Sequence, residues 1–404
     1  MPETTCCVVG GGPAGIMTGY LLARSGVQVT VLEKHKDFFR DFRGDTVHPS
    51  TLQLFHELGL LADFLKIPHQ QMPTVSARIG NYAFTVADFR HLPTQCKFIA
   101  LMPQWDLLSF LAERGKQYPG FDLRMQHEAT GLLTSNGKVI GVKATTPSGP
   151  ARITADLVIG CDGRHSVLRQ AANTQVVELG VPIDVLWFRI SRKDADPQTA
   201  LGNINYGKAL VLINRGDYFQ SGLIIPKGSF DRIQQNGLTA LQQDIARTAP
   251  FLGDRVAELQ DWNQIKLLTV QINRLKQWHQ PGLLLIGDAA HAMSPAGGVG
   301  INLAVQDAVA AANLLAQPLR EGSVTEILLA QIQRRREFPV RVTQRVQALA
   351  HKGLAAVFRN PGPAKAPWRL RLVVNIPGFQ RLLARGVGLG VRPEHIRIKP
   401  EPLD

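Results

Sequence analysis

The sequence predicts an α/β protein made of two interleaved units and a C-terminal helical arm. Within the first 33 of its 404 residues, an apolar run, a glycine turn, an apolar-periodic segment and a second apolar run follow one another. Another apolar run enters a glycine-rich turn at residues 282–302, and strand-like runs separated by Gly- and Asp-rich turns occupy much of residues 174–272. Apolar runs bounded by glycine are typical of buried strands, and alternating runs joined by turns are typical of antiparallel strands. We therefore expect a Rossmann-like unit interleaved with an antiparallel β-sheet unit.

The N-terminal segment has the order strand, turn, helix, strand that gives a GxGxxG motif its meaning. The first strand leads into the turn GGGPAG at residues 10–15, a helix is expected up to Arg24, and the second strand ends at Glu33. Glycine in the motif permits a tight turn, close approach of a pyrophosphate and close helix packing, and the terminal acid accepts hydrogen bonds from ribose hydroxyls. The residues expected to contact a dinucleotide here are Gly10, Gly12, Pro13, Ala14, Gly15 and Glu33.

The stretch GLLLIGDAAHAMSPAGGVGIN at residues 282–302 is a second candidate ligand site. Its apolar residues 283–286 predict a buried strand, so Asp288 would stand at the carboxyl end, where α/β sheets bind ligands. The Ala-, Val- and Leu-rich segment after Gly300 predicts a helix, and uncovered N–H groups at its start form an anion site.

This stretch resembles the second flavin fingerprint of the class A flavoprotein monooxygenases, the family of para-hydroxybenzoate hydroxylase. In that family the Asp contacts the ribityl or pyrophosphate part of FAD, the Pro lies beside the reactive edge of the isoalloxazine, and the glycine turn faces the pyrimidine end. The resemblance implies cofactor contacts at Gly287, Asp288, Pro295, Gly298, Gly300, Ile301 and Asn302.

Three further segments match the same family. A strand over residues 151–159 enters Asp162-Gly163, which resembles the DG fingerprint near the FAD pyrophosphate; the neighbouring Arg164 and Arg169 supply positive charge for phosphates. Arg43 matches a residue that lies along the FAD, and Gln104, before a helix over residues 107–114, matches a residue that contacts FAD.

The sheet unit is expected to carry the substrate. Residues 74–98 contain the hairpin signal Gly80-Asn81, strand-like runs cover 185–191, 209–214, 218–226 and 265–272, and one helix is expected at 238–247. In the resembling family such a sheet lies over the flavin. The candidate substrate-facing residues are Trp187, Arg189, Tyr218, Gln220 and Leu223.

These patterns divide the chain into three parts. A discontinuous FAD-binding domain is expected at 1–73, 99–173 and 273–320, a substrate domain at 74–98 and 174–272, and a helical, basic region at 321–404.

Composition and cysteine spacing restrict the cellular setting. With 45% hydrophobic and 19% charged residues the chain is expected to be globular. It has no run of about 18 uncharged apolar residues, which disfavours a membrane-spanning helix. Its four cysteines lack CxxC spacing, which favours a reduced, cytoplasmic setting without a metal site.

The net charge of +13 is concentrated in the C-terminal arm. From residue 331 onward, fifteen Lys and Arg stand against four acids, a difference of +11. We expect long helices at 300–320 and 324–351, a kink or break at Pro339, and a solvated face carrying Arg334, Arg335 and Arg336. Two interpretations of the tail stay open: an arm packed against the FAD-binding domain, or contact with an anionic membrane or a lipophilic substrate. Nucleic acid is not indicated.

The resemblance implies an enzyme that takes hydride from NADPH or NADH, forms a flavin C4a-hydroperoxide with O2 and hydroxylates an aromatic or other electron-rich small molecule. Arg43 and Pro295 are the main catalytic candidates, and His48, Arg189 and Tyr218 are weaker candidates for activating the substrate. Three alternatives remain: a flavin-dependent halogenase, although its WxWxIP signature is absent; a reductase or dehydrogenase of an isoprenoid or quinone-like substrate; and a flavin-bound ligand-binding protein without turnover.

Overall fold

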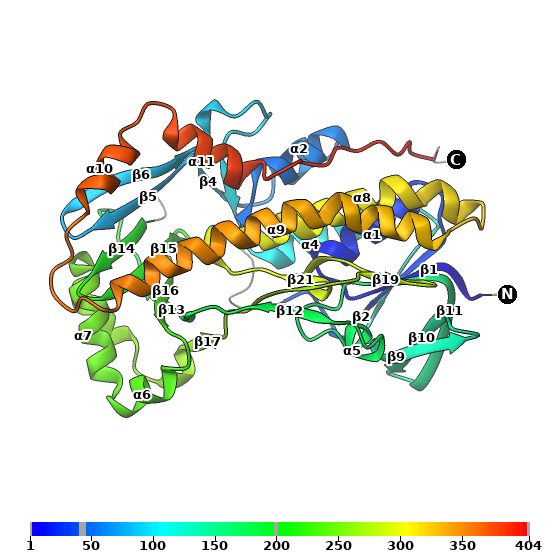
Figure 1. Cartoon of the computed structure of the whole chain (residues 1–404), viewed down its shortest axis with the longest axis horizontal. Coiled ribbons are helices and arrows are strands. Elements are labelled where there is room, and N and C mark those ends of the chain that lie inside the picture. The colour runs from blue at the N-terminus through cyan, green and yellow to red at the C-terminus, as the bar shows by residue number, and fades with distance from the viewer. Residues whose placement is uncertain (1, 40–45, 198–200, 402–404) are drawn as a thin grey trace.

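The structure, a computed structural model, describes residues 2–39, 46–197 and 201–401, which form two main sheets side by side with a long helix along both (Figure 1). The first sheet has the order β19-β20-β11-β1-β2-β8, and every pair from β20 to β8 is parallel. The predicted Rossmann-like sheet is confirmed. Its strands are β1 (Thr4–Val9), β2 (Val29–Glu33), β8 (Phe121–Met125), β11 (Gly149–Gly160), β19 (His279–Gln280) and β20 (Leu283–Leu285), and the hairpin β9 (Glu128–Ser135) and β10 (Lys138–Thr146) extends β11.

Apolar helices cover this sheet and form the largest core cluster with it. The helices α1 (Pro13–Arg24), α4 (Gln104–Gly115) and α8 (Gly300–Arg320) pack together there. One helical segment of the described chain, Ala296–Arg320, is long and apolar enough to cross a membrane by length and composition, contrary to our expectation, but 78% of its most apolar window is buried inside the protein. It is therefore the core helix of this sheet, because its apolar residues already have protein partners.

The second sheet joins two segments that lie far apart in the sequence. Its order is β17-β13-β16-β15-β14-β5-β6, with strands β5 (Thr74–Ile79), β6 (Tyr82–Asp88), β13 (Ile183–Ser191), β14 (Leu201–Asn205), β15 (Lys208–Asn214), β16 (Tyr218–Pro226) and β17 (Lys266–Leu268). The predicted hairpin at Gly80-Asn81 joins β5 to β6. The sheet is not wholly antiparallel, because β5 pairs in parallel with β14. The long crossover between these two strands allows that direction.

Strand alternation divides the second sheet into two chemically different faces. On β13 and β16, Leu186, Phe188, Phe219 and Leu223 share a core with α7 (Leu238–Thr248). The expectation that Leu223 faces the substrate is therefore wrong, because its position in the alternation turns it toward the helix. On the opposite face, register pairs Trp187 with Gly222, Arg189 with Gln220 and Ser191 with Tyr218.

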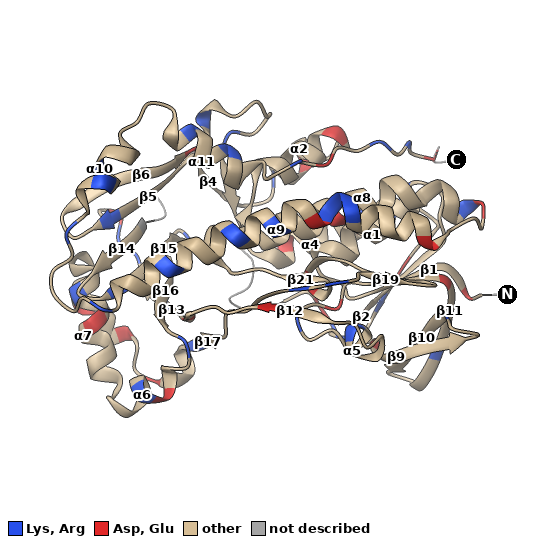
Figure 2. Cartoon of the chain, viewed as in Figure 1, with Lys and Arg blue, Asp and Glu red and all other residues tan. Residues whose placement is uncertain are grey.

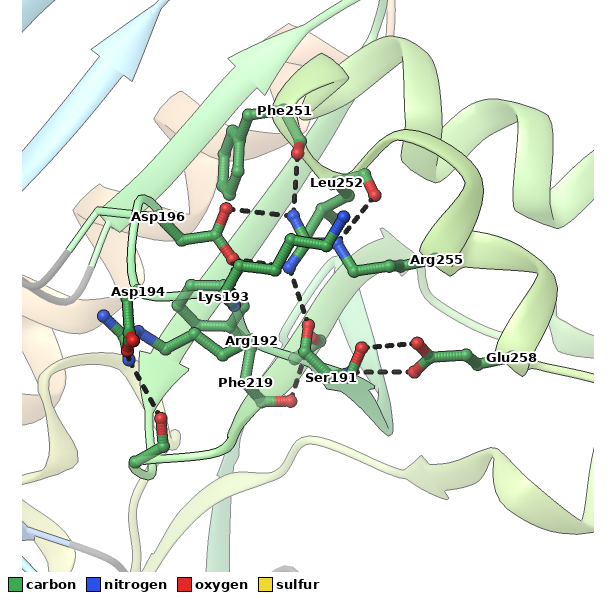
Figure 3. A network of polar contacts seen from close by, with 12 residues as sticks. Ser191, Arg192, Lys193, Asp194, Asp196, Phe219, Phe251, Leu252, Arg255 and Glu258 are labelled. Carbon is green, nitrogen blue, oxygen red and sulfur yellow. Dashed lines mark hydrogen bonds and ion pairs between the residues drawn. The ribbon is translucent and has the colours of Figure 1, made fainter.

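A buried arginine fixes the end of β13 to the layer beneath the sheet (Figure 3). Arg255, in the 3-10 segment η2 (Pro250–Glu258), donates to both carboxylate oxygens of Asp196, at 2.5 and 2.9 Å, and to the carbonyls of Ser191, Phe251 and Leu252. Hydrogen bonds from Arg255 lower the pKa of Asp196, although burial opposes this. The pair therefore holds the end of β13.

Two small sheets and several short helices connect the main layers. Residues 265–272 do not form the single strand that was predicted, because β17 stays in the second sheet whereas β18 (Ile272–Leu275) pairs with β12 (Val176–Leu179) and β21 (His291–Ala292). The remaining elements are β3 (Thr46–Val47), β4 (Gln70–Met72), β7 (Ile99–Leu101), α2 (Pro49–Glu57), α3 (Leu61–Phe64), α5 (Val167–Ala171), α6 (Phe230–Gln235), η1 (Phe89–His91), η3 (Trp262–Gln264), η4 (Gly287–Ala289) and η5 (Ala296–Gly298).

The C-terminal region differs from prediction in the course of its long helix and in the sheet against which its short helices pack. The helix α9 (Glu326–Val357) continues through Pro339, so the predicted break is wrong. The helices α10 (Trp368–Val374) and α11 (Phe379–Gly388) pack on β6 of the second sheet rather than on the first (Figure 1). Residues 389–401, here called the strap, then return to α8 and α1. The N–H groups of Glu394 and Arg397 donate to the side chains of Gln306 and Asn313 on α8, and the N–H of Glu401 donates to the carbonyl of Arg24 at the end of α1.

The arginine triplet of α9 is not a solvated face. Arg336 is 1% exposed, and Arg335 forms a bidentate pair with Glu394 of the strap. Successive helical residues point about 100° apart, so three in a row cannot share one face. One of them must therefore turn toward the protein.

Candidate functional site

Three turns meet at the carboxyl ends of neighbouring strands in the first sheet. They follow β1, β11 and β20, which are adjacent and parallel. Gly10 has φ +104°, and a Cβ on it would lie 2.4 Å from the carbonyl oxygen of Cys161. A Cβ on Gly15 would lie 1.8 Å from the carbonyl oxygen of Gly10. The first and second turns therefore pack backbone against backbone, as the GxGxxG motif predicts.

Other glycines of the site face open space instead. Among the described residues, a Cβ added at Gly12, Gly163 or Gly300 would meet nothing within 4 Å. Gly12 precedes α1 and Gly300 begins α8, and in the described part of the chain neither helix has a side-chain cap, so the N–H groups of both first turns can bind an anionic group. Open space beside uncapped helix starts fits the pyrophosphate and ring of a flavin dinucleotide.

The glutamate at the end of β2 shapes the first turn. Glu33 is 8% exposed, and its carboxylate accepts from the N–H groups of Gly11 and His35, each at 2.9 Å. These two contacts hold the carboxylate beside the first turn, where the motif expects it to meet the ribose of a dinucleotide.

An ion pair connects the second and third turns. Arg164 donates from Nε to Oδ2 of Asp288 at 3.0 Å, and its Nη2 donates to the carbonyl of Met293 at 3.3 Å. Both side chains are about one-third exposed, so the pair lies at the site rather than in the core.

Asp162 has unused hydrogen-bonding capacity inside the site. Its Oδ2 accepts from the N–H of Leu168, while its buried Oδ1 has no hydrogen-bond partner in the described part of the chain. Burial raises the pKa of Asp162, although hydrogen bonds oppose the rise. An unpartnered buried oxygen at this turn is consistent with a missing donor from a bound ligand.

The turn around Pro295 is held from the side of β3 and α2. Gly298 has φ +63°, its carbonyl accepts from Thr46 Oγ1 at 3.0 Å, and a Cβ on it would lie 2.2 Å from that hydroxyl. Asn302 accepts from the hydroxyl of Thr51 at 2.5 Å, while Ile301 is buried in the core. Pro295 and Gly300 are therefore presented on a fixed loop.

The helix α9 holds the other side of the same turn, and sequence reasoning missed this. Gln347 accepts from the N–H of Ser294 at 3.1 Å and donates to the carbonyls of Ser294 and Ala296. The hydroxyl of Ser294 contacts Nε2 of His351 at 2.9 Å, and Gln344 donates to the carbonyls of Asn273 and Ala292. The sequence signal was available, because Gln344, Gln347 and His351 are spaced three and four apart and share one face of a helix.

His48 joins this turn to the C-terminal arm. It precedes α2 and is fully buried, and its Nδ1 contacts the carbonyl of Val387 at 2.9 Å. Burial lowers the pKa of His48 to about 4, although the carbonyls of Val387 and Gly298 oppose the shift. The ring is therefore neutral near pH 7 and is packed between elements.

The remaining predicted residues lie in three places. Gln104 is the first residue of α4 and half-buried, and Arg43 lies outside the described residues. Arg189 is exposed on the second sheet with its guanidinium 4.9 Å from the ring centroid of Tyr218. The structure thus brings the three glycine turns together and places Arg189 and Tyr218 on a different sheet.

A family model described as an FAD binding domain matches residues 3–346 of the chain. The 6-methylpretetramide 4-monooxygenase of Streptomyces rimosus is 30% identical over 385 residues, covering 95% of this chain and 92% of that protein. This chain belongs to the class A flavin monooxygenases. Among solved structures, the OxyS anhydrotetracycline hydroxylase from Streptomyces rimosus has a TM-score of 0.74 at 21% identity, covering 97% of this chain and 77% of that one. The p-nitrophenol 4-monooxygenase PnpA from Pseudomonas putida DLL-E4 has a TM-score of 0.73 at 19% identity, covering 95% and 93%.

The prediction of the family, the fold class and the reaction type is confirmed. The monooxygenase is an oxidoreductase whose cofactor is FAD, with a nicotinamide donor and O2 as co-substrates for hydroxylating an aromatic or other electron-rich small molecule. FAD supplies the redox chemistry when bound, and the protein must bind it, orient it and exclude water.

Two glycine substitutions should separate cofactor binding from folding. Gly12→Val adds a side chain into open space, so we expect the thermal midpoint of the apoprotein to stay within a few degrees while FAD affinity falls at least tenfold. Gly10→Ala meets backbone atoms at 2.4 Å and should destabilise the fold itself. Calorimetry of the apoproteins and quenching of flavin fluorescence would measure both effects. Unchanged FAD affinity in Gly12→Val would disprove our placement of the pyrophosphate.

His48→Asn should flatten the pH dependence of stability. Because the folded pKa of about 4 lies below the ordinary value of 6.5, the stability due to neutral His48 is present above pH 6.5 and is lost as the pH falls toward 4. The full effect would be about 3 kcal/mol. Asn keeps an N–H donor for the Val387 carbonyl, so melting temperatures measured between pH 7.5 and 4.5 should fall less steeply than in the parent. His56→Asn, an exposed position on the helix that follows His48, serves as the control, and identical curves for both variants would refute the assignment.

Proposed function

We propose that this monooxygenase hydroxylates a polycyclic phenolic substrate of the polyketide type, held between the flavin and the face of the second sheet that carries Trp187, Arg189, Tyr218 and Gln220. The observation that carries the proposal is the near end-to-end match to an enzyme named for a pretetramide substrate, with 95% and 92% coverage. A sheet face that carries the aromatic side chains of Trp187 and Tyr218 and the guanidinium of Arg189 suits a flat, ionisable aromatic molecule.

We assign the cofactor contacts from the geometry of the three turns. Residues 10–15 and Glu33 would hold the adenosine and pyrophosphate, with Asp162-Gly163 beside them. Asp288 would accept from the ribityl chain, with Gly287 forming its turn. Pro295 and the N–H groups of residues 298–302 would lie along the flavin ring, where the free donors at the start of α8 stabilise negative charge. Gln104 and Arg43 would complete the contacts.

The domain division follows the two sheets. We propose that 1–73, 99–173 and 273–320 bind FAD, that 74–98 and 174–272 bind substrate, and that 321–404 bridges them. The contacts of α9 with β19 of the first sheet and β15 of the second support this role for the third part.

Arg189 is our candidate for binding the ionised substrate. Its guanidinium is exposed and lies over the ring of Tyr218, so its positive charge stands on the sheet face proposed for the substrate. A phenolate or enolate oxygen there would accept a charge-assisted hydrogen bond, which also favours the electron-rich form that hydroxylation requires. His48 is less suited to this role because its ring is enclosed between α11 and the Gly298 turn.

The test is oxygen-dependent oxidation of NADPH and NADH by the FAD-loaded protein with phenols, tetracyclic polyketides and quinone precursors, while released peroxide is recorded. We expect one polycyclic phenol class to stimulate oxidation with little peroxide released. Arg189→Met should raise its KM about tenfold to a hundredfold without changing FAD content, whereas Arg247→Met, exposed on the helix side of the same sheet, should not. Turnover that needs no oxygen would support the reductase alternative instead.

We also propose that the protein is cytoplasmic and that its C-terminal region, residues 321–404, contacts anionic membranes. No acid occurs between Glu337 and Glu394, while ten Lys and Arg do. Figure 2 shows this basic character on α9, α10 and α11. Trp368, Leu372 and Ile376 are 66%, 61% and 53% exposed there. Apolar side chains interleaved with arginine suit an anionic bilayer surface.

Flotation with phosphatidylglycerol vesicles tests the membrane proposal. The protein should float with these vesicles and not with phosphatidylcholine vesicles, and Trp368→Ser combined with Leu372→Ser should abolish flotation while FAD content is kept. Flotation that is equal for the variant and the parent, or absent for both, would refute it.

A further inference from the structure

A buried charge network lies directly behind the Gly287-Asp288 turn. Asp307 of α8 is fully buried, and its Oδ2 accepts from the N–H of Gly287 at 3.1 Å and from Nε2 of His291 at 2.5 Å. Its Oδ1 accepts from Nε of Arg336, on α9, at 2.9 Å. One carboxylate therefore fixes both the first residue of the turn and the histidine that follows it.

The Asp307 carboxylate is charged despite its burial. Burial alone would raise the pKa of Asp307, but the attraction of His291 and Arg336 and their hydrogen bonds outweigh it and lower the pKa. A charged acceptor binds the Gly287 N–H more strongly than a neutral one. The conformation of the Gly287-Asp288 turn thus depends on the side chains of His291 and Arg336, which keep the Asp307 carboxylate charged and in place.

The strap completes this network from the far end of the chain. Glu394 is 3% exposed, and it accepts from Nη1 of Arg336 at 3.4 Å and from Arg335 through a bidentate pair at 2.7 to 2.9 Å. Its own N–H donates to Oε1 of Gln306, the neighbour of Asp307 on α8, at 2.5 Å. Two carboxylates and two guanidinium groups balance one another; Asp307, Glu394 and Arg336 are almost closed to water, whereas the side chain of Arg335 is 40% exposed.

We propose that Glu394 is a positioning residue for the cofactor: through Arg336 and Asp307 it sets the Gly287-Asp288 turn, so that docking of the strap and binding of FAD are coupled. The inference rests on the cofactor placement proposed above. Gly287 also contacts the first turn, since a Cβ on it would lie 3.1 Å from Cβ of Ala14. A shift of Asp307 would therefore move two cofactor turns at once.

Coupling of this kind is reciprocal. If the docked strap strengthens FAD binding by some factor, bound FAD must strengthen docking of the strap by the same factor. A merely structural strap would support the fold without responding to FAD. The response of the strap to the cofactor is therefore the decisive observation.

The experiment compares the full-length protein with Glu394→Gln, which keeps the shape of the side chain and removes its charge. We expect FAD affinity, measured by flavin fluorescence, to fall by about tenfold. In the parent, FAD should slow hydrogen exchange of the strap amides at 394–397, and in Glu394→Gln this slowing should largely disappear. Lys399→Gln is the control, because Lys399 is an exposed charged residue on the same strap and is not part of the network; it should behave like the parent.

Two further variants distinguish a failure of the proposed coupling from a failure of the cofactor placement. Arg335→Gln removes only the half-exposed partner of Glu394 and should give a smaller loss of the same kind, even if Glu394→Gln folds poorly. Asp288→Ala tests the cofactor placement itself. If Asp288→Ala loses FAD but Glu394→Gln binds it as the parent does, the coupling is refuted and the placement stands. If Asp288→Ala also binds FAD normally, the placement fails.

Discussion

The glycine turn after β20 depends on one constraint. The backbone of residues 273–298 is irregular and forms few strand hydrogen bonds, so it must find hydrogen-bond partners in side chains. Its strands β18, β19, β20 and β21 have only two to four residues each, so many N–H and C=O groups lack a ladder. Buried backbone groups without partners are costly. The buried face of α9 supplies them with side chains, since Gln333, Gln344 and Gln347 each bond the backbone of this segment.

This explains why a buried helix face is polar. A glutamine side chain carries both a donor and an acceptor, as a peptide group does, and can replace a missing strand. Arg336 serves the same segment indirectly, through Asp307 and the N–H of Gly287. Residues 273–298 and the polar face of α9 therefore form one structural unit, although the whole of α8 separates them in the sequence.

Much of the first sheet could be predicted from local sequence, because its glycine motifs fix backbone geometry at specific residues. Gly10 and Gly15 lie where only glycine fits, and such positions leave a sequence signal. The sequence did not predict that Leu223 lies on the helix-covered face of the second sheet, since alternation alone does not say which face of a sheet a helix covers. The roles of Arg336 and Glu394 depend on contacts between segments almost sixty residues apart, which no local pattern records. The parallel pairing of β5 with β14 is equally remote in sequence.

The unbroken course of α9 has a consequence for how the enzyme accommodates its substrate. A helix of 32 residues is about 48 Å long, and this one contacts both sheets, so it acts as a fixed spacer between them. A hinge movement that closes one sheet onto the other would have to bend or detach this helix. If flavin and substrate lie between the two sheets as proposed, the height of the space that holds them is therefore set at folding, and substrate selectivity would rest on the side chains of the sheet face rather than on movement of the frame.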